Sequence, residues 1–320
     1  MPVTMALPVG FLIAVAATPL AGTLARRLGI LDRPGPLKGQ ERPVPYLGGL
    51  AVFSATGAVA MFVRPALLIP LGLALVLGLV DDAGDLDART RLCCEIGIGA
   101  VAGVLLPTGL PGVLGPALTA VAVVALVNAV NLVDGLDGLA SAVSLVSALG
   151  FAALLGGDGR LLALGLAGAL GGFLVYNRPP ARIYLGDAGA YFAGTALALL
   201  LAAAWSGDRP VAHGLAALGF VGAVLVETAV AVVRRWRAGQ ALFQGDRSHV
   251  YDQLVDRGWP IGRIALAWAA AQGLLAAVAL GASRLDAGLA AAAMIATATL
   301  VLAAVWAGGF LRVPAPRRQP

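Results

Sequence analysis

Long apolar runs recur along the whole chain and are separated by short polar stretches. A membrane-spanning helix needs about 20 mainly apolar residues. Eleven runs approach or reach that length, and the shorter ones require a locally thin bilayer or a tilted neighbour. These runs cover residues 4–25, 45–63, 66–80, 93–106, 116–131, 138–155, 160–176, 189–204, 211–233, 262–282 and 286–311. The pattern predicts an all-α polytopic transmembrane helical bundle of about eleven helices, forming a single domain over residues 1–320.

The basic residues predict how this bundle is oriented. If the N-terminus lies outside the membrane and the runs alternate, all but four of the 22 Lys and Arg residues fall in the inner loops and the C-terminal tail. The four exceptions are Arg64, Arg160, Arg209 and Arg284. Cytoplasmic loops carry such an excess of Lys and Arg, so we expect an outer N-terminus and a cytoplasmic C-terminus.

Composition agrees with a membrane protein and excludes two other classes. The chain is 59% hydrophobic and only 12% charged, whereas soluble domains carry about 25% charged residues. The net charge of +5 follows the loop pattern and suits anionic lipid head groups, so nucleic acid is not expected as a partner. Only two His residues occur, His213 and His249, which excludes a His-rich metal site.

The first polar motif is the acidic pair Asp81-Asp82, directly after the apolar run 66–80. Carboxylates at a helix C-terminus oppose the helix dipole, at a cost of about 0.3–1 kcal/mol each. Because the preceding run is short, these acids are predicted to lie below the lipid head groups, where ionisable residues are usually functional. The alternative is a solvated acidic turn.

Two further motifs combine acids, amides and glycines at the ends of apolar runs. Asn128, Asn131, Asp134 and Asp137 lie between the runs 116–131 and 138–155. Either acid could simply cap the following helix, but a cap explains one residue and not four. Asn177 and Asp187 flank a loop that contains two prolines and ends in Gly-Asp-Ala-Gly. Asp187 could likewise be a cap, and Asn177 offers a donor and an acceptor that suit an amide-bearing base.

The longest inner loop, at about 234–261, contains Asp-Arg-Ser-His-Val-Tyr-Asp around Arg247 and His249. A lone His is more often a packing or surface residue, yet beside an Arg it could contact a phosphate. Glu227 is a further acid inside the run 211–233. The predicted topology places all four motifs on one face. Oxygen ligands there suit a hydrated Mg²⁺ bound to a diphosphate, and therefore a reaction between a soluble nucleotide and a lipid.

At this point the chain resembles the polyprenyl-phosphate N-acetylhexosamine-1-phosphate transferases. The resemblance runs from about Asp32 to Gly258, through LDRPGPLKGQERPVPYLGG, DDAGDLDARTRL, NAVNLVDGLDGLA, GFLVYNRPPARIYLGDAGA and GDRSHVYDQL. Five ordered motifs at compatible spacing make it specific. It implies transfer of a sugar-1-phosphate from a UDP-sugar to a polyprenyl phosphate (undecaprenyl or decaprenyl), with release of UMP. Mg²⁺ is the implied cofactor, and Mn²⁺ is an acceptable substitute.

The resemblance also implies roles for five catalytic acids. Asp81 and Asp82 match the pair that handles the lipid phosphate, and Asp81 is the candidate for keeping it deprotonated. Asp134 and Asp137 match acids that line the nucleotide pocket, and Asp187 matches the acid that binds the metal.

Amide and basic positions complete the implied site. Asn131 matches an amide that also approaches the metal, and Asn177 matches a position in the nucleotide pocket. The substrate-binding candidates as a set are Lys38, Asn128, Asn131, Asn177, Arg247 and His249.

Three departures from the family pattern bear on the sugar. Gln40 stands where the family often has a His, Arg91 and Glu95 replace a usual Lys and Gln, and only His249 remains of a three-His run. The muramoyl-pentapeptide enzymes resemble an unbroken His run, so a GlcNAc-type donor is favoured. Another UDP-N-acetylhexosamine, including UDP-MurNAc-pentapeptide, stays as the alternative.

The implied setting is the bacterial inner membrane, with the active site on the cytoplasmic face and membrane lipids and a second copy of the chain as further partners. A transporter is the alternative from another class. It would need polar groups near the bilayer midplane, whereas here the polar residues gather at one end of each apolar run.

Overall fold

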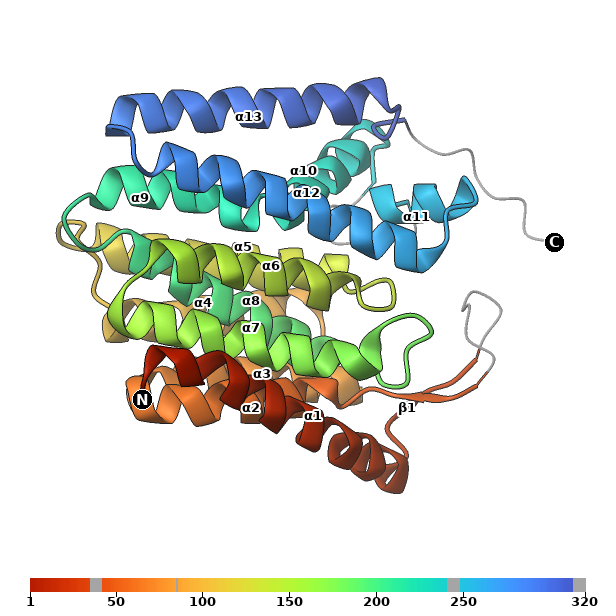
Figure 1. The fold of residues 1–320 in the computed structure, drawn as a ribbon. Helices are drawn as coiled ribbons and strands as arrows, with labels where there is room; N and C mark the ends of the chain where they lie inside the picture. The colour runs from red at the N-terminus through yellow and green to blue at the C-terminus, as the bar shows by residue number, and fades with distance from the viewer. Residues whose placement is uncertain (35–41, 85, 241–247, 313–320) are drawn as a thin grey trace.

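The computed structural model describes residues 1–34, 42–84, 86–240 and 248–312. Helices run side by side along the molecule, and a two-residue antiparallel strand pair, β1 (Leu31–Asp32) and β2 (Val44–Pro45), lies at one end (Figure 1). The helices are α1 (Val3–Leu28), α2 (Gly48–Val63), α3 (Leu68–Gly84), α4 (Ala88–Leu105), α5 (Leu114–Val133), α6 (Leu139–Leu154), α7 (Gly157–Asn177), α8 (Gly186–Ala204), α9 (Pro210–Ala217), α10 (Gly222–Arg237), α11 (Val250–Asp256), α12 (Ile261–Ala282) and α13 (Ala287–Ala307), with 3-10 turns η1 (Pro65–Leu67) and η2 (Leu218–Val221).

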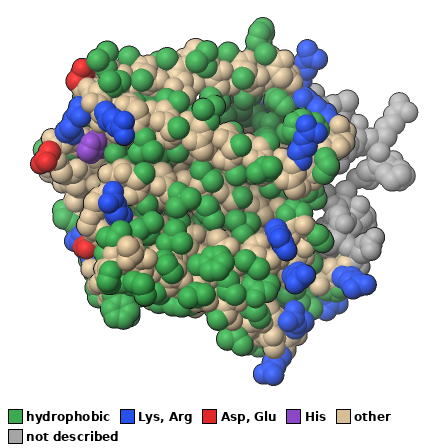
Figure 2. Space-filling view, in the orientation of Figure 1, with side chains coloured by type: hydrophobic (Ala, Val, Ile, Leu, Met, Phe, Trp, Pro, Cys, Tyr) green, Lys and Arg blue, Asp and Glu red, His purple; other side chains and the backbone are tan. Residues whose placement is uncertain are grey.

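The all-α prediction is confirmed. Among the described residues, eight helical segments are long and apolar enough to cross a membrane, and α2 and α6 are shorter apolar helices. The protein is therefore a multi-pass membrane protein. Figure 2 shows a wide hydrophobic surface, with basic side chains gathered at the end that bears α11 and mixed charges at the opposite end.

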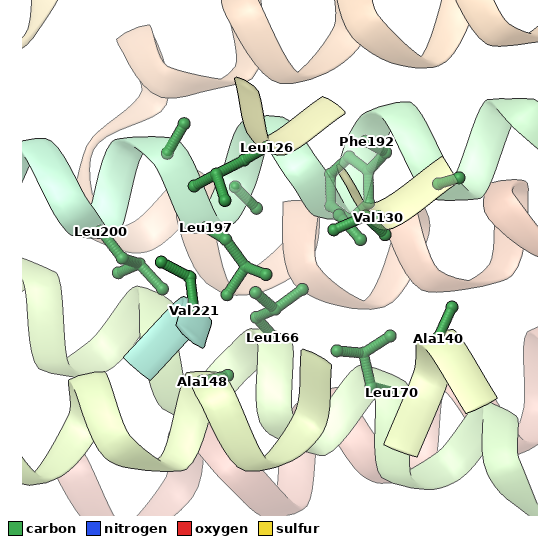
Figure 3. Close-up of a cluster of buried hydrophobic side chains, with 14 of the residues drawn as sticks. Leu126, Val130, Ala140, Ala148, Leu166, Leu170, Phe192, Leu197, Leu200 and Val221 are labelled. Carbon is green, nitrogen blue, oxygen red and sulfur yellow. The ribbon is translucent and has the colours of Figure 1, made fainter. Parts of the chain in front are cut away.

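Helix α8 forms the centre of the bundle. In the most apolar 18 residues of α8, 89% of the residues are buried, whereas in the corresponding stretch of α13, at the edge of the bundle, 6% are buried. Figure 3 shows α8 side chains packed against α5, α6, α7 and η2. The labelled residues there are Leu126, Val130, Ala140, Ala148, Leu166, Leu170, Phe192, Leu197, Leu200 and Val221. Because α8 is held on all sides, its first turn is a rigid place for a functional side chain.

The ninth predicted helix, 211–233, is not continuous. It divides into α9, η2 and α10, and the buried Gln272 of α12 replaces the interrupted backbone hydrogen bonds. Its Oε1 accepts from the Ala223 N–H at 2.9 Å, and its Nε2 donates to the Gly219 carbonyl at 3.0 Å. A break inside a membrane helix requires such a partner, since lipid offers none.

Two other predicted boundaries were wrong. The run 66–80 extends one turn further, to Gly84, so Asp81 and Asp82 are inside α3. Helix α4 begins at Ala88, not 93, because the Asp87 carboxylate accepts the N–H groups of Arg89 and Thr90 at 3.0 and 3.1 Å. Hydrogen bonds from Thr90 lower the pKa of Asp87, as expected when an ionised carboxylate caps the N-terminus of a helix. The short helix α11 in the inner loop was not predicted.

Candidate active site

The first turn of α8 meets the last turn of α3 through Asp82. Its Oδ1 accepts the N–H of Asp187 at 2.9 Å, and its Oδ2 accepts the N–H of Ala188 at 3.1 Å. These are N–H groups that a helix start leaves without an intrahelical partner, and the helix dipole favours an anion there. Gly186 makes the junction possible, since it has a φ of 74° and a Cβ would lie 2.9 Å from Asp82 Oδ2. Asp82 therefore fixes Asp187 relative to α3.

Asp81 points to different neighbours. It is 4% exposed, its Oδ1 accepts the Leu86 N–H at 2.8 Å, and its Oδ2 lies 3.2 Å from the Arg91 guanidinium. The Tyr191 hydroxyl also donates to this oxygen. The carboxylate thus holds α3, α4 and α8 together, while its assigned role toward the lipid phosphate stays a prediction.

The C-terminal end of α5 brings an amide to the same place. Asn131 Nδ2 donates to Asp187 Oδ1 at 2.6 Å, so the two residues matched to the metal site are in contact. Asp134 follows directly after α5 and is partly buried. Burial first, and then the charges of Asp187, Asp82 and Asp137, raise its pKa well above the ordinary range. Carboxylates from three helix ends therefore repel one another across one small region.

Asp137 joins this region to the loop before α8. Its Oδ2 accepts the Ala181 N–H at 2.8 Å. Nearby, burial together with the charges of Asp137, Asp32 and Asp134 raises the pKa of the Tyr184 phenol to about 12. Tyr184 is consequently neutral near pH 7 and presents a hydroxyl group beside the acids.

Two predicted amides are used inside the fold. Asn177 is 3% exposed, accepts from the Ser141 hydroxyl at 3.0 Å and donates to the Ile183 carbonyl at 2.9 Å. Asn128 donates to Glu95 Oε2 at 2.6 Å and to the Val124 carbonyl at 2.8 Å. The structure gives both residues a bracing role, and their contact with substrate stays a prediction.

His249 is buried at the start of α11. Its backbone N–H donates to Asp252 Oδ2 at 3.2 Å, and its ring stacks on Tyr251 with 5.1 Å between centroids and 12° between planes. The Tyr251 hydroxyl donates to the Leu132 carbonyl at 2.8 Å. The inner-loop motif therefore contacts the end of α5, just before Asp134, which agrees with the prediction that the polar motifs share one face. Lys38 and Arg247 lie outside the described residues.

Sequence reasoning missed Tyr191 as a site residue. It lies four residues after Asp187, which places both on one face of α8, and its hydroxyl reaches Asp81 and lies 3.4 Å from Arg91. That spacing was a usable signal. Over the described ranges, no group of three or more His, Cys, Asp or Glu side chains has the geometry to hold a metal by itself, so a bound cation would need further oxygen ligands.

Fold and site together define a polytopic membrane protein whose acids and amides gather at one end of the bundle. Residues 65–204 match the model of glycosyl transferase family 4. The chain is 32% identical to the decaprenyl-phosphate N-acetylglucosaminephosphotransferase of Mycobacterium tuberculosis, over 80% of this chain and 76% of the relative. It is 29% identical to the probable undecaprenyl-phosphate N-acetylglucosaminyl 1-phosphate transferase of Bacillus subtilis, over 80% and 78%. The chain belongs to this family of polyprenyl-phosphate N-acetylhexosamine-1-phosphate transferases.

Proposed function

We propose that the protein transfers N-acetylglucosamine-1-phosphate from UDP-GlcNAc to a polyprenyl phosphate. A phosphate oxygen of the lipid attacks the β-phosphorus of the nucleotide. The bond from that phosphorus to the bridging oxygen breaks, and UMP leaves. Similar relatives from Bacillus, Mycobacterium and Thermotoga carry names for this transfer. The observation that carries the proposal is the meeting of Asp82, Asn131 and Asp187 at the first turn of α8.

We further propose Mg²⁺ as the cofactor, held by Asp187 and Asn131. The donors at this place are carboxylate and amide oxygens, which suit Mg²⁺. Burial, together with the charges of Asp187, Asp82 and Asp137, raises the pKa of Asp134, and a bound cation would relieve the repulsion among these acids. When bound, the ion would neutralise the diphosphate and make its phosphorus more electrophilic. Substrate phosphates and water would complete its ligands, as is usual for this metal.

The protein's own residues then have separable tasks. Asp82 holds the first turn of α8 against α3, and Asn131 holds the Asp187 carboxylate against α5. The acceptor is a lipid whose phosphate is confined to the membrane surface. Acids at the helix ends would therefore act by holding the donor close to that phosphate, and no strong base is required. The excess of basic residues at this end, visible in Figure 2, supports a cytoplasmic site in a bacterial inner membrane.

The test is UMP release by the purified protein with polyprenyl phosphate, Mg²⁺ and one UDP-sugar at a time. We expect release with UDP-GlcNAc that requires the lipid and stops when a chelator is added. Release with only another UDP-N-acetylhexosamine would keep the reaction and change the donor. Folded protein that releases UMP from none of them would overturn the proposal.

A comparison of two variants tests whether Asp81 of the acidic pair matters more for activity than His249. Asp81→Asn should lower kcat/KM about twentyfold, because it removes a charge-assisted hydrogen bond to Arg91. His249→Ala should lower it less than about fivefold, since it removes ring packing on Tyr251 and the contact with Glu227 but leaves Asp81, Asp82 and Asp187 in place. Kinetics of UMP release, with thermal unfolding as the folding control, measure both. The reverse order would make His249 the more important group.

A further inference from the structure

Glu227 is a buried acid that the proposed reaction leaves without a task. It lies in α10, inside the apolar segment Pro210–Arg237, and is 2% exposed. Charged side chains within a membrane segment are costly and usually serve a specific partner. Its Oε1 accepts the Val250 N–H at 2.7 Å and lies 3.6 Å from His249 Nδ1. Both contacts are to the first turn of α11, so Glu227 fixes that turn on α10.

Helix α11 in turn presses on the acidic loop after α5. The Tyr251 hydroxyl donates to the Leu132 carbonyl at 2.8 Å, one of the carbonyls that a helix end leaves without an intrahelical donor. The Tyr251 ring also covers Gly135, where a Cβ would lie 2.8 Å from Tyr251 Cζ. Leu132 and Gly135 flank Asp134 closely in the chain. A contiguous set of contacts therefore runs from Glu227 through α11 to the loop that carries Asp134 and Asp137.

We infer that Glu227 is a positioning residue for the nucleotide-sugar donor, acting through Val250, His249 and Tyr251 on the loop 132–138. The inference rests on the proposed function, in which a UDP-sugar is the donor, and on the resemblance that matches Asp134 and Asp137 of this loop to acids of the nucleotide pocket. Glu227 touches neither substrate nor metal. Its carboxylate sets where Tyr251 meets the end of α5, and thus how the acids of that loop are held when the donor arrives. Changes at Glu227 should therefore raise KM for the UDP-sugar, and they should leave kcat and KM for the lipid nearly unchanged.

The matched variants are Glu227→Gln, Tyr251→Phe, their double variant and Thr228→Val. Gln keeps an oxygen for the Val250 N–H and removes the charge that faces His249, while Phe keeps the ring and removes the bond to Leu132. Thr228 is the control, because within the part of the chain that the structure describes its hydroxyl donates to the Val224 carbonyl of the same helix, at 2.9 Å. Weakening the contact with His249 in Glu227→Gln, and losing the hydrogen bond to Leu132 in Tyr251→Phe, should each raise KM for the UDP-sugar about fivefold.

The double variant separates positioning from general destabilisation. If both residues act along one set of contacts, the double variant should raise KM little more than the larger single effect. In all variants kcat and KM for the lipid should stay within about twofold of wild type, and Thr228→Val should leave all three constants there. Multiplied single effects, or equal losses in kcat and in both KM values, would overturn the inference.

Hydrogen exchange gives a readout that needs no turnover. Glu227→Gln and Tyr251→Phe should speed deuterium uptake in peptides covering 132–138 and 248–257, because each loosens one end of the same set of contacts. Thr228→Val should not. Unchanged uptake at 132–138 in both variants would refute the coupling, even if wild-type protein were active. Conversely, wild-type protein that releases no UMP would refute the proposed function, and the exchange data would still decide whether Glu227 orders this loop.

Discussion

Replacing Asp187 by Asn should lower the turnover number at least a hundredfold while the protein stays folded. Asn has the same shape and keeps an oxygen that can accept from Asn131, and the backbone N–H still donates to Asp82. What disappears is the negative charge at the proposed metal site. Each factor of ten in rate corresponds to about 1.36 kcal/mol of activation free energy. The unfolding temperature should change little. The lost attraction between the carboxylate and the helix N-terminus is about 0.3–1 kcal/mol, and it is offset by less repulsion from Asp82 and Asp134.

UMP release over a range of Mg²⁺ concentrations measures this effect. Asp158→Asn is the matched control, because Asp158 is also an acid in the first turn of an apolar helix, α7. It lines a different cavity, together with Arg64, Leu106 and Ser206. The control should keep wild-type turnover. Near-normal turnover and unchanged Mg²⁺ dependence of the Asp187→Asn protein would contradict the proposal that Asp187 binds the metal.

The sequence was sufficient to predict the bundle because apolar length is a local signal. The eleven runs correspond to helices in the structure, with α2 and α6 among the shorter ones. The break between α9 and α10 was not predictable from the run 211–233 alone. The residue that makes it tolerable, Gln272, lies on α12 about fifty positions later. Nor did apolar length indicate α11, which is held by contacts from Glu227 and Asp252 rather than by an apolar face long enough to detect.

The sequence predicted that acids and amides from distant motifs lie on one face, and the structure brings Asp82, Asn131 and Asp187 into contact. The sequence did not predict which partner each side chain takes. Asp81 and Asp82 look equivalent as neighbours in sequence, but successive residues on a helix point about 100° apart. Asp81 consequently meets Arg91 and Tyr191, and Asp82 meets the N–H groups at the start of α8. Similarly, Asn177 was expected to suit an amide-bearing base, and the resemblance placed it in the nucleotide pocket. In the structure its acceptor and donor are bonded to Ser141 and Ile183. Which partner a polar side chain takes depends on helices far away in sequence.

The spacing between α3 and α8 leads to the last prediction, Gly78→Ala. A Cβ at position 78 would lie 2.5 Å from the backbone carbon of Asp187, far inside van der Waals contact. Backbone cannot rotate away as a side chain can, so α3 must move from the first turn of α8. Asp82 lies one turn after Gly78 on the same face, and its bonds to the N–H groups of Asp187 and Ala188 would lengthen. Turnover should fall at least a hundredfold, and the free energy of unfolding should drop by about 1–3 kcal/mol.

Gly72→Ala provides the control on the same helix, since a Cβ at Gly72 meets no atom within 4 Å. Ala is favoured over Gly inside a helix by about 1 kcal/mol, so intrinsic propensity pushes both variants toward greater stability. A loss of stability in Gly78→Ala must therefore come from the contact between α3 and α8. UMP release and thermal unfolding of the two variants, measured side by side, isolate that contact. Normal turnover in Gly78→Ala would mean that the site tolerates a wider spacing, and that the bonds from Asp82 to the start of α8 are not needed to hold Asp187 in place.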